Sequence, residues 1–164
     1  RKISSTVARI KLGLANELRL GTLSPQRDWG YAGDYVKAMH LMLQSATPDD
    51  YVIATGKQYS VREFVEKAAP YFGMQITWRG EGLNEIGYDV FTGNEVIKVS
   101  PKYFRPAEVE TLLGDATRAK EKLGWEPKYD LKSLVEEMME EDVKLFQKDI
   151  LLRKGGFLIP QQIE

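Results

Sequence analysis

Apolar residues recur at helical spacing in several parts of the chain. Every third or fourth position is apolar in three stretches, residues 3–16, 31–46 and 131–145. Ser60 to Glu63 form the capping-box pattern Ser-x-x-Glu, which predicts a fourth helix that Pro70 ends or kinks. Asp115 is a good N-cap for a short fifth helix that ends near Gly124. The chain is therefore expected to contain five helices.

Short apolar runs between these helices predict strands. They lie at residues 18–20, 51–56, 75–79 and 95–99. The run at 51–56 ends in glycine and is typical of a buried parallel strand. The glycine-rich stretch 80–93 is expected to form a mobile or hairpin-like insertion. This order of elements predicts an α/β fold with a smaller mixed lobe over residues 1–149, followed by a tail at 150–164 that shows no period.

Composition narrows the class of protein. The 164 residues suit one domain or one large lobe. Lys plus Arg number 23 and Asp plus Glu 24, and this balance gives no support for a nucleic-acid partner. Disulfides are excluded because the chain has no cysteine. No run approaches the roughly 18 apolar residues of a membrane span, so no membrane partner is expected. The chain opens on Arg1 within a predicted helix, which suggests part of a longer protein.

Several catalytic patterns are missing from the sequence. Neither G-x-G-x-x-G nor the P-loop pattern occurs, and no tyrosine has a lysine four residues later. The single histidine, His40, is expected to be packed or half-exposed on its helix. The acidic run 136–142 is expected to be a solvated helix face rather than a metal site. We therefore predict no catalytic residue and no metal ligand in this chain.

Two loop arginines carry the candidate chemistry. Arg27 lies in Arg-Asp-Trp-Gly directly before a predicted helix, and Arg105 lies between Phe104 and Pro106. Guanidinium groups offered from loops can bind a diphosphate bidentately. Two ordinary surface ion pairs would explain the same residues.

Four segments of the sequence resemble one family, the GDP-mannose 4,6-dehydratases among the extended short-chain dehydrogenases. These segments are residues 1–21, 27–43, 51–69 and 103–127. The block DATRAKEKLGWEP is shared widely among extended short-chain dehydrogenases, whereas VIATGKQYSVREFV and YFRPAEVETLLGD are more specific to this family. The resemblance extends from residue 1 to about residue 148.

This resemblance implies a fold and a reaction. The chain would supply late elements of a Rossmann domain plus the small mixed α/β lobe that binds the sugar nucleotide. The family converts GDP-mannose to GDP-4-dehydro-6-deoxy-mannose with loss of water, and uses tightly held NADP. The NADP site and the catalytic residues would lie in an N-terminal half upstream of Arg1, so this chain alone is expected to be inactive. A cytoplasmic homo-oligomer, a dimer or tetramer, is expected on family grounds.

The resemblance also implies binding residues. Arg27 and Arg105 should clamp the diphosphate, and Glu108 should bond the nucleotide at ribose or base. The guanosine side should be lined by Lys2, Leu20 and Gly21. A carboxylate facing the donor edge of guanine would also select against adenine. The chain departs from the family over residues 22–26, where Thr22 replaces an asparagine and Ser24-Pro25 replace an acidic residue and its neighbour.

Two other functions stay open at this point. The chain is also compatible with the lobe of another sugar-nucleotide enzyme, such as a GDP-sugar epimerase or a CDP- or dTDP-sugar dehydratase, which nucleotide selectivity would distinguish. It is equally compatible with a non-catalytic module for nucleotide binding or assembly, which would bind GDP without a partner polypeptide.

Overall fold

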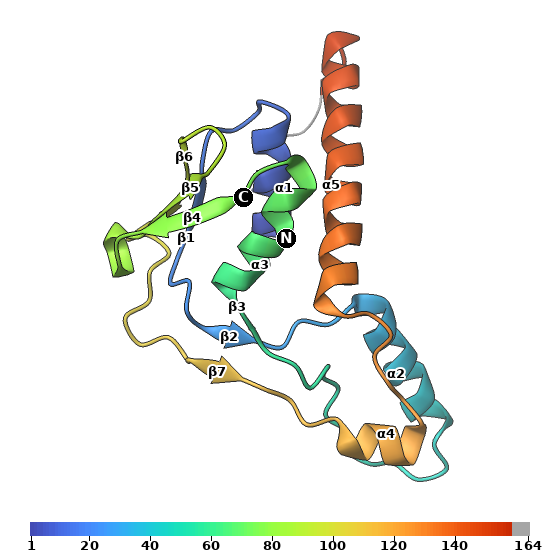
Figure 1. Ribbon diagram of the computed structural model, residues 1–164. Coiled ribbons are helices and arrows are strands. Elements are labelled where there is room, and N and C mark those ends of the chain that lie inside the picture. Colours follow the sequence, from blue (N-terminus) through green and yellow to red (C-terminus); the bar gives the residue numbers. More distant parts are fainter. Residues whose placement is uncertain (159–164) are drawn as a thin grey trace.

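The computed structural model describes residues 1–158 and is a mixed α/β fold, as predicted. Its elements in chain order are α1 (Lys2–Lys11), β1 (Leu18–Leu20), β2 (Gln26–Arg27), α2 (Ala32–Gln44), β3 (Tyr59–Ser60), α3 (Val61–Ala68), the 3-10 turn η1 (Ala69–Phe72), β4 (Ile76–Arg79), η2 (Gly82–Asn84), β5 (Ile86–Asp89), β6 (Glu95–Val99), β7 (Thr111–Leu112), α4 (Thr117–Leu123) and α5 (Leu131–Lys154). Figure 1 shows α1, α3 and α5 beside a sheet at one end, and α2 with α4 at the other.

A four-stranded sheet in the order β1-β6-β5-β4 forms the larger end of the molecule. β1 pairs in parallel with β6, whereas β5 is antiparallel to both β6 and β4. α1 and α3 lie between this sheet and α5 (Figure 1), and together these elements bury one continuous core. Its members include Val7, Leu18, Phe64, Ile97 and Met139. This core fixes the positions of β1 and β6, from whose ends the candidate site is built.

A small three-stranded sheet, β3-β2-β7, lies between the two ends of the molecule (Figure 1). β2 is its central strand, antiparallel to β3 and parallel to β7. The register sets Arg27 opposite Tyr59 on one side and Leu112 on the other. Segments far apart in sequence therefore meet around Arg27.

The capping box at Ser60 is confirmed. The Ser60 hydroxyl accepts a bond from the Glu63 backbone N–H at 3.1 Å, and the Glu63 carboxylate accepts one from the Ser60 N–H at 2.6 Å. These bonds lower the pKa of Glu63 below its usual value, because they favour the charged carboxylate. The helix continues into the 3-10 turn η1, which contains Pro70, and stops at Gly73 with φ +71°.

A second, smaller core holds α2 and α4 together. Trp125 is 1% exposed and packs with Ala38 and Ala119. Its indole N–H donates to the backbone carbonyl of Asp34 at 2.8 Å. The buried Asp34 carboxylate accepts bonds from the N–H groups of residues 128 and 129, at 2.8 and 3.1 Å. Asp34 thereby ties the start of α2 to the segment that leads into α5.

The predicted helix over 3–16 is wrong at its end. α1 stops at Lys11, because Gly13 takes a left-handed conformation with φ +69°. The Gly13 N–H then bonds the Ile10 carbonyl and the Leu14 N–H bonds the Arg9 carbonyl. A mid-pattern glycine thus ended the helix despite the apolar residues that follow it.

The predicted buried strand at 51–56 is also wrong in this structure. Residues 51–55 are assigned to no strand, and Val52 is 55% exposed. α2 has a matching feature, since three residues of its predicted apolar side face outward, Val36, Met39 and Leu43. The unpaired apolar segment 51–55 and the exposed apolar row of α2 lie at the same end of the fold.

Two further boundaries differ from the prediction. Of the two alternatives for residues 80–93, the hairpin-like one is confirmed, because β5 pairs on both sides within the sheet. Gly87 makes this packing possible, since a Cβ there would lie 2.9 Å from the Trp78 ring. α5 continues to Lys154, so residues 150–154 of the expected tail are helical, and residues 159–164 lie outside the described part.

We predict that Asp34→Ala lowers the free energy of unfolding by about 2 kcal/mol, because two backbone N–H groups lose their acceptor. Urea unfolding monitored by Trp fluorescence measures this. Exposed Asp50→Ala is the control, with an expected change within roughly 0.5 kcal/mol. Equal stability of the two variants would show that Asp34 does not hold this junction.

Candidate functional site

The candidate site forms where the segment after β1 meets the loop between β6 and β7. This loop, residues 100–110, turns tightly at its start, where the N–H groups of Tyr103 and Phe104 both donate to the Ser100 carbonyl, at 3.0 and 2.9 Å. The Ser100 N–H in turn donates to the Leu20 carbonyl at 2.8 Å. The end of β1 is thereby fastened to the loop that carries Arg105 and Glu108.

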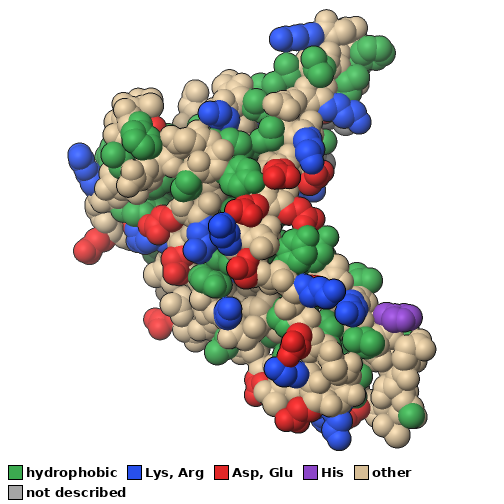
Figure 2. Space-filling model, turned by 45° about the vertical axis from the view of Figure 1, so that its right-hand side comes forward, with side chains coloured by type: hydrophobic (Ala, Val, Ile, Leu, Met, Phe, Trp, Pro, Cys, Tyr) green, Lys and Arg blue, Asp and Glu red, His purple; other side chains and the backbone are tan. Residues whose placement is uncertain are grey.

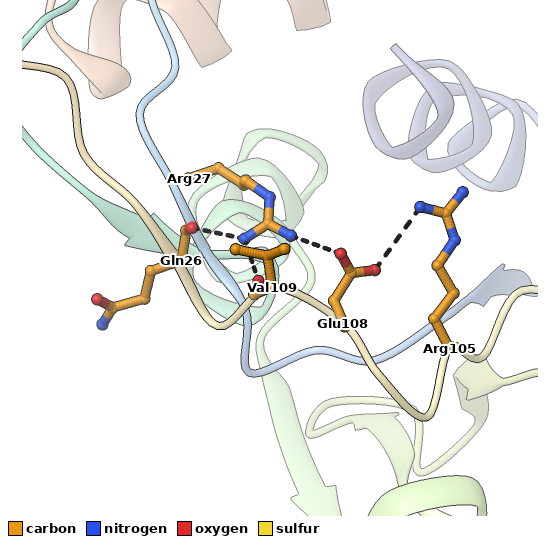
Figure 3. Close-up of polar contacts among 5 residues, drawn as sticks. All are labelled: Gln26, Arg27, Arg105, Glu108 and Val109. Atoms are coloured by element: carbon orange, nitrogen blue, oxygen red, sulfur yellow. Dashed lines mark hydrogen bonds and ion pairs between the residues drawn. The ribbon is translucent and has the colours of Figure 1, made fainter.

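Arg27 is braced by the same loop. Its guanidinium donates to the backbone carbonyls of Gln26 and Val109 at 2.7 and 2.8 Å, and to the Glu108 carboxylate at 2.8 Å (Figure 3). The Arg27 side chain is 23% exposed and that of Glu108 is 24% exposed. Partial burial makes this charge-assisted contact stronger than a surface pair, and its position is well defined.

Arg105 approaches the same carboxylate from the other side. Its guanidinium lies 3.9 Å from the second oxygen of Glu108, and its side chain is 77% exposed (Figure 3). The two predicted arginines therefore converge on one carboxylate and do not form separate ion pairs. Arg105 directs most of its donors to solvent and can accept a further anion.

Asp28, next to Arg27, has a different role. Its carboxylate accepts bonds from the Thr55 N–H and hydroxyl, at 2.9 and 2.6 Å, and from the Gly56 N–H at 2.9 Å. Arg27 and Asp28 thus bond to different segments and do not pair with each other.

Of the three predicted guanosine-side residues, Lys2 and Gly21 lie against Tyr103, whereas Leu20 does not. The Lys2 ammonium lies 3.2 Å from the centroid of the Tyr103 ring. Hydrogen bonding by Lys2 and its positive charge lower the pKa of the Tyr103 hydroxyl below its usual value, and the charge of Lys102 adds a smaller effect. Gly21 approaches the backbone of the same residue, because a Cβ on Gly21 would lie 2.3 Å from the Tyr103 carbonyl oxygen. Leu20 is 7% exposed and contributes to the core beneath.

Sequence reasoning noted the aromatic residues before Arg105 but did not assign Tyr103 to the site. Gly21 at the end of a strand was a sequence signal for this contact, because glycine is required where another backbone approaches closely. Its partner 82 residues later (103 minus 21) could not be found from spacing alone.

The stretch 22–26, which departs from the family pattern, lies beside this contact. The Thr22 hydroxyl is buried and has no hydrogen-bond partner within residues 1–158. A buried hydroxyl without a partner is costly. The replacement of the family's asparagine by Thr22 therefore changes the polar lining next to Gly21.

A hollow of about 250 Å³ lies near Trp29 and was not predicted from the sequence. It is lined by aromatic and polar side chains, among them Thr55, Tyr59 and Tyr129. The charged side chains at its edge are Lys57, Lys128 and Asp130.

Between residues 1 and 158, no group of three or more His, Cys, Asp or Glu side chains is arranged to hold a metal ion. None of the described helices is long and apolar enough to cross a membrane. His40 is exposed on α2. Figure 2 shows acidic and basic side chains interspersed over the visible face, which agrees with the near-neutral charge.

Comparison with known proteins identifies relatives of the whole site region. A family model described as GDP-mannose 4,6 dehydratase matches residues 1–138. GDP-mannose 4,6 dehydratase 2 of Caenorhabditis elegans is 52% identical over 91% of this chain and 39% of its own length. The human GDP-mannose 4,6 dehydratase is 50% identical, over 90% of this chain and 40% of its own. That of Vibrio cholerae is 43% identical and covers all of this chain and 47% of its own. The chain thus spans less than half the length of these relatives.

Solved structures support the fold. RMD from Pseudomonas aeruginosa, complexed with NADPH, superposes with a TM-score of 0.68 at 21% identity, over 87% of this chain and 41% of that one. A UDP-glucose 4-epimerase from Bifidobacterium longum, in complex with NAD+ and UDP, gives 0.62 at 16% identity, over 89% and 40%. At these identities the likeness concerns architecture.

The matched residues 1–138 contain all six predicted site residues, and identities of 43–52% extend over nearly the whole chain. The chain belongs to the GDP-mannose 4,6-dehydratase family.

Proposed function

We propose that this chain is the substrate-binding part of a GDP-mannose 4,6-dehydratase, a lyase that converts GDP-mannose to GDP-4-dehydro-6-deoxy-mannose with loss of water. The observation that carries the proposal is the convergence of Arg27 and Arg105 on Glu108, within a region that matches the family. Lys2 adds a third cation to the same loop through its contact with Tyr103. Two guanidinium groups facing one carboxylate suit an anionic ligand such as a nucleoside diphosphate.

In this proposal Arg27 and Arg105 have different roles in binding the diphosphate. Arg105, with most of its donors exposed, contacts the diphosphate directly. Arg27 offers its remaining donors while two backbone carbonyls hold its guanidinium in place. Because Glu108 bonds Arg27, a bound diphosphate shares or replaces that carboxylate as the arginine's partner. Glu108 is then available to the ribose or to the donor edge of guanine.

The cofactor of the proposed reaction is NADP, which supplies oxidation and reduction of the sugar. The described residues do not fit it, since the sequence has no glycine fingerprint and no Tyr-x-x-x-Lys pair. We place the cofactor and the reacting groups on the remaining part of a longer protein. In this proposal residues 1–149 form the binding lobe with late Rossmann elements. The 164-residue chain alone turns over no substrate, and the complete protein is a cytoplasmic dimer or tetramer.

The exposed apolar side chains of α2 and the unpaired segment 51–55 support the proposal that a further part of a longer protein packs here. Val36, Met39 and Leu43 are 62%, 59% and 82% exposed along one row of the helix. Such a row is costly in water unless another element covers it. The remaining part of the Rossmann sheet would cover it and pair with residues 51–55.

The function is tested by incubating the complete protein with GDP-mannose and NADP and following the sugar nucleotide by mass spectrometry. Loss of one water from GDP-mannose, with no net consumption of cofactor, supports the proposal. Intact mass of every polypeptide in the sample comes first, because a sample that contains only the 18.7 kDa chain is expected to be inactive. Tight binding of UDP or dTDP in preference to GDP would instead favour another sugar-nucleotide enzyme.

We predict that Arg105→Ala weakens binding of GDP-mannose to the complete protein at least tenfold, since diphosphate oxygens lose a charged donor, about 1.5–3 kcal/mol. Calorimetric titration gives the dissociation constant. Arg118→Ala is the matched control, because Arg118 pairs with Asp49 on the far end of the fold and should leave affinity unchanged. An unaltered affinity in Arg105→Ala would remove Arg105 from the site.

We predict that Gly21→Ala weakens binding of GDP at least fivefold. The added methyl would meet the Tyr103 carbonyl oxygen at 2.3 Å, so the loop must move, at a cost of about 1–3 kcal/mol. Affinity is measured by calorimetry beside Ser24→Ala, an exposed neighbour expected to behave as the parent protein. If both variants bind GDP equally well, the close approach of the two segments is irrelevant to the ligand.

A further inference from the structure

We propose that Tyr103 is a positioning residue of the nucleotide site, and that it acts by holding the Lys2 ammonium against its ring. The inference deepens the proposed function and rests on it. The roles proposed above for the loop arginines do not involve Tyr103, and the family resemblance implied no role for it.

The first observation is the geometry of the Lys2 contact. The ammonium lies 3.2 Å from the ring centroid, well inside the range in which a cation is attracted by the face of an aromatic ring. The ammonium of Lys102 lies further away, at 5.3 Å. A lysine side chain is otherwise free to occupy many rotamers, and the ring restricts it to one region. Lys2 is thereby kept ready for the ligand.

The second observation is that the backbone of Tyr103 is itself held in place. Its N–H bonds the Ser100 carbonyl at 3.0 Å, and its carbonyl lies against Gly21 with no room for a Cβ. The next residue, Phe104, packs on the main core. The backbone that carries the ring is therefore anchored from β1, from the end of β6 and, through Phe104, from the core, so the ring projects from a fixed support.

The third observation is the position of Tyr103 between the two halves of the candidate site. It contacts Lys2 and Gly21, which the family resemblance assigns to the guanosine side, and it precedes Arg105 by two residues. Loss of the ring should consequently weaken contacts to the nucleoside and leave contacts to the diphosphate intact. A purely structural role would weaken both.

The test is a double-mutant cycle in the complete protein, with GDP and inorganic diphosphate as separate calorimetric ligands. Tyr103→Leu and Lys2→Met should each weaken GDP binding roughly two- to fivefold, the size of an exposed cation–π contact. The double variant should bind GDP no more weakly than Lys2→Met alone. Affinity for inorganic diphosphate should change less than twofold in Tyr103→Leu. Tyr103→Phe keeps the ring and should retain the parent affinity.

Thermal melts accompany each variant, and Tyr103→Gln takes the place of Tyr103→Leu if the latter melts below the assay temperature. Additive effects of the two single substitutions, or an equal loss of GDP and diphosphate binding, would overturn the positioning role while the proposed function stands. If the parent protein binds no GDP, the proposed function itself fails, and this inference fails with it.

Discussion

The parallel pairing of β2 with β7 is the contact on which the candidate site depends. It sets Gln26 opposite Thr111 and Arg27 opposite Leu112, so that two loops about 80 residues apart run side by side. Each strand has only two residues, and the backbone carbonyl of Val109 adds a further bond to the Arg27 guanidinium. A charged side chain thus supports a sheet too short to be stable alone.

The larger sheet supplies the second constraint. β1 and β6 are fixed by the main core, and the loop that leaves β6 turns back at once over the end of β1. Gly21 permits the approach because it has no side chain. Together the two sheets place three cations, Lys2, Arg27 and Arg105, around one loop.

Local chemistry explains what the sequence could predict. The capping box at Ser60 and the glycine stop at Gly124 depend on neighbours within a few residues, and both were confirmed. The pattern at 51–56 failed because a strand needs a partner that local sequence does not contain. For the same reason the resemblance implied Arg27, Arg105 and Glu108 as site residues, whereas the ion pairs that join them and the contact of Lys2 with Tyr103 emerged only from the fold.

The long sequence separation between contacting site residues has a consequence for synthesis on the ribosome. Arg27 and Glu108 are 81 positions apart, so the arginine's carboxylate partner leaves the exit tunnel long after the arginine itself. At typical elongation rates of about 5–20 residues per second, that interval lasts several seconds. Contacts this remote in sequence also form slowly. The nascent chain therefore exposes the Arg27 guanidinium for that interval, before the carboxylate that pairs with it has been synthesised.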